Sequence, residues 1–367
     1  MIYYIRLRGF LNAKCYGIDP KNYFNTLRSL VVRYDYLIFI GRFQPFHTGH
    51  ESVVRKALEL SSKVIILVGS AYQPRTVRNP WDFSEREALI RLAFSQEENK
   101  RILIFPLLDY VYNNQLWIKS VQQIVAGVAH NNIASQAKIG LIGHKKDESS
   151  SYLSDFPQWD FVEASNYNNI SSSEIRKSYF EDGEVRSDLL NSNIAIELDK
   201  FKKSDAYKQV KAEYDFVKKY KSAWDCAPYK PTFVTVDAVV IQSGHILLIE
   251  RKAQPGRGLM ALPGGFVNPK ERLKDAVIRE LREETRIKVP APVLAGSITK
   301  EQIFDDPYRS ARGRTITQAF LIELHGDKLP KVKGGDDAKK AFWVPFAEIK
   351  PEMMFEDHYH IIQAIVG

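Results

Sequence analysis

Residues 35–50 read Asp35-Tyr-Leu-Ile-Phe-Ile-Gly41-Arg-Phe-Gln-Pro-Phe-His47-Thr-Gly-His50, and they decide the fold. The apolar run before Gly41 predicts a buried strand, and the residues after His47 predict the start of a helix. Gly41 suits a tight turn between the two. A helix start presents free N–H groups and the positive end of its dipole, which bind phosphate. His47 and His50 lie three residues apart there, so we expect both imidazoles to face the phosphates.

Strand and helix patterns alternate along the chain after this stretch. Apolar runs of strand length are separated by segments with helical spacing. This alternation predicts an α/β fold with a Rossmann-like doubly wound parallel sheet, whose ligands bind at the carboxyl ends of the strands. The predicted strands are residues 35–40, 63–68, 101–105, 138–142 and 159–163, and the predicted helices are residues 51–61, 85–95 and 116–129.

A second predicted helix start lies in Ile170-Ser-Ser-Ser-Glu-Ile-Arg176. Its Ser-x-x-Glu pattern is typical of a capping box, and Arg176 lies one turn inside the helix. Hydroxyl groups and a guanidinium at a helix start indicate an anion site, although such a pattern is often only a cap. The chain has neither the G-x-x-x-x-G-K-S/T nor the G-x-G-x-x-G pattern, so we expect neither a P-loop nor a dinucleotide-binding fingerprint.

A domain boundary is expected in a lysine-rich segment. Residues 204–224 predict one long helix, and two prolines within residues 226–231 end it and form a stiff connector. Strand patterns at 232–242 and 245–250 and a helix at 273–284 then predict a second, mixed α/β domain. We therefore divide the chain into an extension (1–34), a first domain (35–200), a connecting helix and linker (201–230) and a second domain (231–367).

Three glutamates share one face of the predicted helix 273–284. Glu280, Glu283 and Glu284 stand at positions i, i+3 and i+4, so their carboxylates repel one another unless a cation lies there. Hard oxygen ligands in this number suit Mg²⁺ or Mn²⁺. Arg279 is placed to pair with Glu283 one turn on. The alternative is a solvated acidic face without a ligand.

Composition limits the classes of function. The 367 residues are 44% hydrophobic and 26% charged, as in a globular protein. They include only two cysteines, which argues against a disulfide framework and for a reducing, cytoplasmic location. No apolar run is long enough to span a membrane. The net charge is +8, but segments 1–35 and 201–221 carry +4 each, so the regions with the predicted sites are neutral and nucleic-acid binding is not expected.

The two phosphate motifs, residues 41–50 and 170–176, resemble the signatures of the His-x-Gly-His nucleotidyltransferases. They are most similar to the archaeal-type nicotinamide mononucleotide (NMN) adenylyltransferases, and the resemblance spans about residues 35–200. It implies that His47, His50 and Arg176 are catalytic and that ATP is bound by Gly41, Arg42, Phe43, His47, His50, Ser172, Ser173 and Arg176. Ser173 stands where the family usually has Thr, which keeps the hydroxyl. Matching segments at 78–81 and 114–117 imply that NMN is bound by Arg78, Asn79, Trp81, Asn114 and Trp117.

The glutamate helix resembles the Nudix box. The pattern Gly265-x5-Glu271-x7-Arg279-Glu-Leu-x-Glu-Glu284 matches the box up to its last glutamate, whereas Arg286 stands where the family has the Gly that takes a left-handed turn. The resemblance implies a Nudix α/β/α sandwich in which Glu283 is catalytic and Glu280, Glu283 and Glu284 bind Mg²⁺ or Mn²⁺. Segments 304–314, 335–338 and 355–358 resemble Nudix enzymes that act on ADP-ribose. We expect substrate contacts from Gly264, Gly265, Arg312 and Arg314.

Together the resemblances imply a bifunctional enzyme of NAD metabolism. Its expected partners are ATP, NMN and ADP-ribose: it would transfer AMP from ATP to NMN, giving NAD and pyrophosphate, and hydrolyse ADP-ribose to AMP and ribose 5-phosphate. The transfer needs only positioning and charge stabilisation, because the attacking phosphate is already an anion. The alternative is an adenylyltransferase for another phosphate acceptor, fused to a Nudix module that senses ADP-ribose without cleaving it. The complete set of box carboxylates favours the enzyme, and a homo-oligomer is left open.

Overall fold

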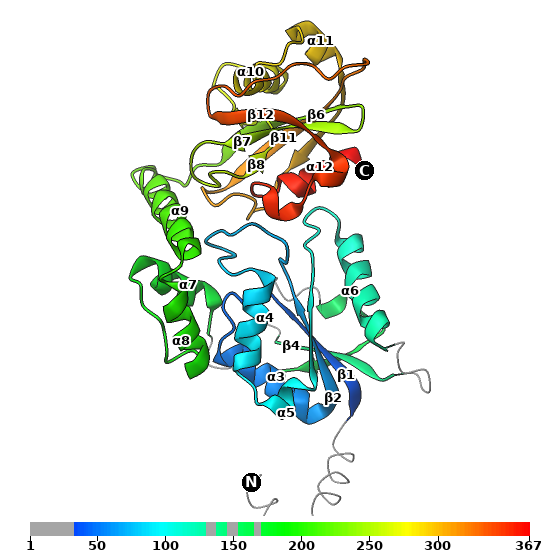
Figure 1. Ribbon diagram of the computed structural model, residues 1–367, viewed down its shortest axis with the longest axis vertical. Helices are drawn as coiled ribbons and strands as arrows, with labels where there is room; N and C mark the ends of the chain where they lie inside the picture. Colours follow the sequence, from blue (N-terminus) through cyan, green and yellow to red (C-terminus); the bar gives the residue numbers. More distant parts are fainter. Residues whose placement is uncertain (1–32, 130–136, 145–152, 165–169) are drawn as a thin grey trace, which may run out of the picture.

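Two domains are stacked along the long axis of the computed structural model, which describes residues 33–129, 137–144, 153–164 and 170–367 (Figure 1). The predicted extension, residues 1–34, lies outside the described residues except for Arg33 and Tyr34, at the start of the first strand. Across the described ranges, every helix is too short or too polar to cross a lipid bilayer.

The N-terminal domain is built on a parallel sheet in the strand order β3-β2-β1-β4-β5. Its strands are β1 (Tyr34–Gly41), β2 (Ser61–Val68), β3 (Ile102–Pro106), β4 (Ile139–Gly143) and β5 (Asp160–Glu163). Its helices are α3 (Thr48–Leu60), α4 (Phe83–Leu92), α5 (Gln96–Asn99), α6 (Asn114–Ala129), α7 (Ser172–Glu181) and α8 (Ser192–Phe201). The strand order reverses between β1 and β4, which confirms the predicted doubly wound fold and places its crevice at their carboxyl ends.

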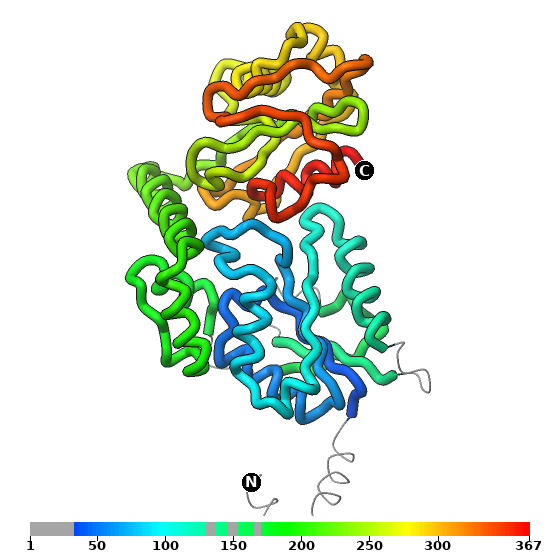
Figure 2. The backbone as a smooth tube through the Cα atoms, viewed as in Figure 1, coloured from blue at the N-terminus to red at the C-terminus, as the bar shows by residue number. Residues whose placement is uncertain are grey.

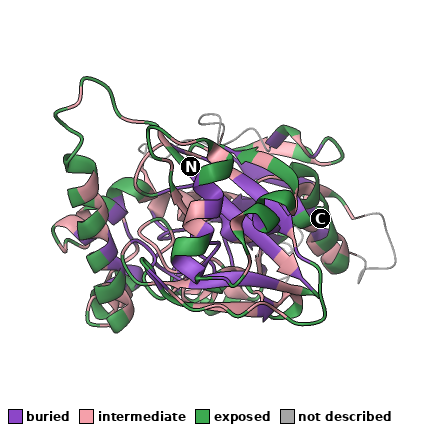
Figure 3. Ribbon diagram, turned by 90° about the horizontal axis from the view of Figure 1, so that it is seen from above, coloured by how far each residue is buried: buried purple, intermediate pink, exposed green. Residues whose placement is uncertain are grey.

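Both faces of this sheet are covered by helices. Leu37 and Phe39 of β1 belong to a core shared with α3, α4 and α7, whereas Tyr36 and Ile38 belong to a core shared with α6. Successive side chains of a strand point to opposite faces, so the unbroken apolar run in β1 reflects burial on both sides. Figure 3 shows the strands as the buried centre of the molecule.

Helix α9 (Asp205–Ser222) connects the two domains along one side of the molecule (Figure 2). Its N-cap is Ser204, whose Oγ accepts a hydrogen bond from the backbone N–H of Tyr207 at 3.1 Å. Val210 packs into the N-terminal core, and buried Glu213 accepts a hydrogen bond from the backbone N–H of Gly256 in the C-terminal domain at 3.2 Å. The predicted lysine-rich helix therefore contacts both domains as well as joining them.

The C-terminal domain is a mixed sheet between two helical layers. The strand order is β10-β11-β6-β7-β12, with β8 paired to β7 and β9 to β6, and only the β6–β11 pair is parallel. One face packs against α10 and α11 and the other against α12, which confirms the predicted α/β/α sandwich. The strands are β6 (Phe233–Gln242), β7 (His245–Arg251), β8 (Met260–Ala261), β9 (Gly264–Phe266), β10 (Ile298–Phe304), β11 (Thr315–Glu323) and β12 (Ala338–Pro345). The helices are α10 (Leu273–Thr285), α11 (Ala291–Gly296), α12 (His358–Val366) and the short 3₁₀ turns η2 (Phe346–Glu348) and η3 (Pro351–Met353).

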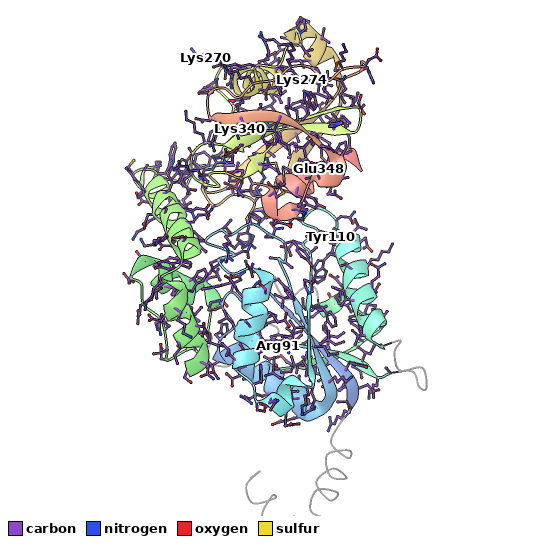
Figure 4. All side chains as sticks on the ribbon, in the orientation of Figure 1. Arg91, Tyr110, Lys270, Lys274, Lys340 and Glu348 are labelled. Carbon is purple, nitrogen blue, oxygen red and sulfur yellow. The ribbon has the colours of Figure 1, made fainter. Side chains whose placement is uncertain are left out.

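The crevice of the N-terminal domain opens toward the C-terminal domain. The loops that follow β2 and β3 reach across: Gln73 Nε2 lies 3.1 Å from His360 Nε2, and the Tyr112 hydroxyl donates to the carboxylate of Asp357. Tyr110 lies at this junction, near α12 (Figure 4). The second domain therefore sits over the carboxyl ends of the parallel strands.

Helix α10 ends in a left-handed residue that carries a side chain. Arg286 is the C-cap, with φ 46° and ψ 33°, so the turn that glycine makes in the Nudix box is kept here by an arginine. For a residue with a Cβ atom this conformation costs about 1 kcal/mol. Arg286 therefore stores a small amount of backbone strain at the end of the glutamate helix.

Arg286→Gly is expected to raise the free energy of unfolding by about 0.5–1 kcal/mol, because glycine adopts this turn without a Cβ clash. Arg282→Gly is the matched control: Arg282 is also exposed but lies inside α10, where glycine is expected to cost about 1 kcal/mol. Urea unfolding of both variants measures the difference. Destabilisation by both substitutions would contradict the account of this turn.

Candidate active sites

A cavity of about 860 Å³ opens where the parallel strands of the N-terminal domain end. Residues at the carboxyl ends of four strands line it, namely Gly41, Gly69, Leu107 and His144. Its size is ordinary for a pocket that holds a ligand of nucleotide size. The predicted ATP and NMN residues that line it are Gly41, Arg42, His47, His50, Arg78, Asn79, Asn114, Trp117, Ser172 and Ser173.

The loop after β1 is held by close packing at Gly41. A Cβ atom there would lie 2.8 Å from ring atoms of Phe43, which is too close for any side chain. The left-handed residue of this loop is Phe43, with φ 52°. Because Phe43 is buried and packs against Gly41, the loop backbone is fixed before any ligand binds.

The two histidines are held together at the start of α3. His47 is the N-cap, and its backbone N–H donates to His50 Nδ1 at 3.3 Å. The two imidazoles stack with ring centroids 3.6 Å apart, and the rings of Phe43 and Phe46 lie 5.0 and 5.5 Å from that of His50. Because Nδ1 of His50 accepts a hydrogen bond, the proton of the neutral ring is assigned to Nε2, which is then a donor. The site thus offers fixed donors beside a helix N-terminus.

Three arginines share the electrostatic field of this cavity. Burial, and then the charge of Arg78, lowers the pKa of Arg42 to about 10. Burial, and then the charges of Arg42 and Arg78, lowers the pKa of Arg176 to about 9. The guanidinium charges therefore repel one another across the cavity. Arg42 Nη1 is buried without a hydrogen-bond partner among the described residues. A polyphosphate would supply that partner and offset the repulsion.

Three residues that we expected at the ligand do not line the cavity. Phe43 is buried in the core, and Trp81 is 2% exposed and packs against Tyr179 and Phe201. Arg176 donates to the backbone carbonyl of Gln44 at 2.6 Å and to Ser173 Oγ at 3.1 Å. Arg176 therefore holds the loop after β1 through the carbonyl of Gln44, and its charge lies just behind the cavity wall.

Arg86, to which we had assigned no role, holds the ends of two strands. Its guanidinium is 1% exposed and donates to the carbonyls of Arg42 at 2.8 Å, Gly69 at 2.7 Å and Ser70 at 3.1 Å. The sequence offered one signal for this role: Arg86 stands on the same face of α4 as the apolar residue Leu89. An arginine on the buried face of a helix needs acceptors in the core.

The start of α6 forms another part of the cavity wall. Asn114 begins this helix, and its Nδ2 lies 3.4 Å from a carboxylate oxygen of Asp155. Trp117 lines the cavity and also packs against Phe156, with ring centroids 5.9 Å apart. One face of this indole therefore belongs to the core, as its position on an amphipathic helix requires.

In the C-terminal domain, Arg279 gathers three of the Nudix-box carboxylates. It contacts Glu271 at 2.5 Å, Glu280 at 2.7 Å and Glu283 at 3.0 Å. The contact with Glu283 confirms the pairing expected one turn apart on α10. The side chain of Glu280 is only 13% exposed, so this face of α10 is not simply a solvated acidic surface.

Glu284 completes the glutamate face from a buried position. Its Oε2 accepts a hydrogen bond from the backbone N–H of Gly264 at 2.9 Å. Burial, and then the charge of Glu280, raises the pKa of Glu284 to about 8. A Cβ atom on Gly265 would meet the Glu280 carboxylate at 2.6 Å, so the glycine backbone lies directly over the acidic face.

The arrangement at Gly264 and Gly265 fits a divalent cation chemically. Carboxylate oxygens of Glu280, Glu283 and Glu284 lie on one helix face beside an open backbone, and hard oxygen donors are what Mg²⁺ and Mn²⁺ prefer. Among the described residues, no three Asp, Glu, His or Cys side chains are gathered closely enough to form a preassembled metal centre. Binding would therefore draw these side chains together.

The predicted substrate arginines differ in their surroundings. Arg312 lies 5.2 Å from the ring of Phe266 and 4.0 Å from Glu356, whereas Arg314 donates to the backbone carbonyl of Asp305. Sequence reasoning missed Arg251, which ends β7. It lies 3.9 Å from the ring centroid of Phe355, and burial together with the charge of Arg312 lowers its pKa. A second pair of repelling guanidiniums therefore lies near the glutamate helix.

Comparisons with known proteins match both halves of the chain. Residues 38–178 match the cytidylyltransferase-like family, and residues 231–365 match the NUDIX domain family. A nicotinamide/nicotinic acid mononucleotide adenylyltransferase from Acinetobacter baylyi is 40% identical over 50% of this chain and 94% of that protein. An ADP-ribose pyrophosphatase from Methanocaldococcus jannaschii is 38% identical over 35% of this chain and 70% of that protein.

One solved structure is similar over both domains. It is a bifunctional NMN adenylyltransferase/ADP-ribose pyrophosphatase from Francisella tularensis, which is 39% identical and has a TM-score of 0.84 over 90% of this chain and 98% of that one. That enzyme has also been solved in complex with AMP and a manganese ion.

Mn²⁺ is expected to stabilise the parent protein and to lose this effect in Glu284→Gln. At a cation concentration of about 100 times Kd, the free energy of unfolding should rise by about 2.7 kcal/mol. Without added cation the variant should melt higher than the parent at neutral pH, because folding buries Glu284 and raises its pKa to about 8, whereas the amide is neutral in both the folded and the unfolded state. Thermal unfolding with and without Mn²⁺ measures both effects.

The matched control is Glu348→Gln, on the exposed turn η2 of the same domain (Figure 4). It should keep the full cation response of the parent. An equal response in the Glu284 variant would show that Glu284 does not bind the cation.

Proposed function

Since the chain belongs to the family of bifunctional NMN adenylyltransferase/ADP-ribose pyrophosphatases, we propose that it makes NAD from ATP and NMN and hydrolyses ADP-ribose to AMP and ribose 5-phosphate. We assign residues 35–200 to the adenylyltransferase, 201–230 to the connecting segment and 231–367 to the Nudix hydrolase. The observation that carries the first assignment is the cavity at the end of β1, which is lined by Arg42, Arg78 and two fixed imidazoles and lies in the field of the buried Arg176. The second assignment rests on the carboxylates held around Arg279 and Gly264.

The transfer needs cations and donors and no nucleophilic side chain. A phosphate oxygen of NMN attacks the α-phosphorus of ATP, a new P–O bond forms, the bond to the β-phosphate oxygen breaks, and pyrophosphate leaves. His47 and His50 donate hydrogen bonds to phosphate oxygens as charge shifts onto the leaving group. Arg42 compensates that charge, and Arg78 and Asn79 face the acceptor. Fixed donors of this kind need no rearrangement during the reaction, so they stabilise the transition state efficiently.

Hydrolysis adds water across the diphosphate of ADP-ribose. We propose that Glu280, Glu283 and Glu284 hold Mg²⁺ or Mn²⁺; divalent metal use is expected from the Nudix family and from the manganese ion of the Francisella enzyme. When bound, the cation supplies a Lewis acid that withdraws charge from the diphosphate. Arg279 fixes the directions of Glu280 and Glu283, and Arg251 and Arg312 are placed to neutralise the substrate phosphates.

We also propose a cytoplasmic location. Cys226 is a free and exposed thiol, and such thiols persist in reducing compartments. Purified protein incubated with ATP and NMN, with ATP and nicotinic acid mononucleotide, and separately with ADP-ribose tests both activities and the choice of acceptor. Each reaction is run with Mg²⁺ and with Mn²⁺, and the products are separated by chromatography. Absence of dinucleotide with either acceptor would overturn the adenylyltransferase assignment.

His50→Ala is expected to lower kcat for dinucleotide synthesis by about 100-fold to 1,000-fold, as for the loss of one donor to a transition-state oxygen. KM should change less, because the donor acts mainly on the transition state. Initial rates over a range of ATP and NMN concentrations measure both. Hydrolysis of ADP-ribose by the same variant is the internal control and should be unchanged. Near-normal turnover would exclude His50 from catalysis.

Glu283→Gln is expected to lower the rate of ADP-ribose hydrolysis by at least about 100-fold. The amide keeps the shape of the side chain but removes the charge that compensates a divalent cation. Because the Glu283 side chain is 46% exposed, the fold should be unaffected. Dinucleotide synthesis by the variant should match that of the parent. Hydrolysis at the parent rate would show that this face of α10 is not the catalytic one.

A further inference from the structure

The C-terminal domain contributes part of the wall of the adenylyltransferase cavity. Asp306, Tyr308 and Asp357 line the same cavity as His47 and His50. Asp306 and Tyr308 lie between β10 and β11, and Asp357 is the N-cap of α12. The cavity in which we place dinucleotide synthesis is therefore closed on one side by the hydrolase domain.

Across this boundary, Arg78 lies against the ring of Tyr308. Its guanidinium carbon is 5.1 Å from the ring centroid, and Nη1 lies 3.4 Å from the backbone carbonyl of Tyr308. Arg78 has no carboxylate within ion-pair distance among the described residues. By contrast, Arg75 on the same loop pairs with Asp82 and Glu85. An aromatic face attracts a guanidinium without neutralising it, so the charge of Arg78 stays available to a ligand.

The backbone around Tyr308 is held by hydrogen bonds within the C-terminal domain. Its backbone N–H donates to Asp306 Oδ1 at 2.8 Å. The next residue, Arg309, is buried and forms two hydrogen bonds with Asp357, at 2.9 and 3.0 Å. Asp357 in turn accepts from the hydroxyl of Tyr112 in the N-terminal domain. The backbone beside Tyr308 is therefore held by a buried ion pair of the C-terminal domain, and the hydrogen bond from Tyr112 links that pair to the N-terminal domain.

We propose that Tyr308 is a positioning residue for the adenylyltransferase: it holds the guanidinium of Arg78 where the phosphate of the acceptor mononucleotide binds. The inference rests on the proposed function of the N-terminal domain. The charges of Arg42 and Arg176 repel Arg78 and favour its movement out of the cavity toward solvent. The negative face of the Tyr308 ring opposes that movement, so the hydrolase domain helps to assemble the acceptor site.

The test compares Tyr308→Ala and Tyr308→Phe in the full chain. Loss of the ring is expected to raise KM for NMN about fivefold, the effect of losing one exposed cation–π contact, with KM for ATP and kcat within about twofold of the parent. Phenylalanine keeps the aromatic face and should restore KM for NMN. Because Tyr308 is 71% exposed, neither change removes core packing. Tyr229→Ala, on the exposed linker, is the matched control and should leave all constants unchanged.

The outcomes separate this inference from the function on which it rests. A parent protein that makes no dinucleotide overturns the proposed function, and the inference with it. An active parent with an unchanged or lower KM for NMN in Tyr308→Ala overturns the inference alone. An equal rise in KM for both substrates, or a failure of Tyr308→Phe to restore the parent value, also overturns it, because a general opening of the boundary would then be the cause.

Discussion

The buried guanidinium of Arg86 is the interaction on which the N-terminal cavity depends. It bonds to carbonyls that follow β1 and β2, at Arg42, Gly69 and Ser70. A buried charge is tolerated only when its donors are satisfied, so these carbonyls must stay where Arg86 requires them. A hydrogen bond from the N–H of Gly69 to the carbonyl of Gly41, at 2.8 Å, also joins the ends of these two strands. The loop after β1 is therefore positioned by the protein itself, so a ligand that binds there loses no free energy in ordering it.

A second buried network fixes the two domains relative to each other. Asp237 of β6 accepts from Thr317 Oγ1 at 2.6 Å and lies 3.9 Å from Arg309, which is bound to Asp357. Asp357 then accepts from Tyr112 of the other domain. The boundary contact thus continues into the core of the C-terminal sheet through polar groups that satisfy one another. Such networks are rigid, because each member left without its partner would be costly. Rigidity at this boundary is what allows a residue of one domain to shape the site of the other.

Local patterns predicted the sheet, the loop after β1 and the glutamate helix, because each is encoded in neighbouring residues. The position of each side chain relative to the ligand was harder to predict. Trp81 stands in a matching motif, yet its loop turns the indole into the core beside Tyr179, and no local spacing reveals that turn. Arg86 bonds to carbonyls that lie 16 to 44 residues away in the sequence. Tyr308 contacts Arg78, which lies 230 residues away. Contacts at such distances depend on the assembled fold, so a single sequence read by periodicity does not identify them.

The two domains carry side chains of opposite charge, although both are built to act on a diphosphate bond. The N-terminal cavity gathers cations: the charge of Arg78 lowers the pKa of Arg42, and the charges of Arg42 and Arg78 lower the pKa of Arg176, each beyond the effect of burial. The glutamate helix gathers anions, and the charge of Glu280 raises the pKa of Glu284 beyond the effect of burial. In each case the protein holds like charges closer than they would lie in water. A polyphosphate relieves the first repulsion and a divalent cation relieves the second. Forming a diphosphate and cleaving one therefore rest on the same principle: electrostatic energy stored in the fold is released when a ligand of opposite charge binds.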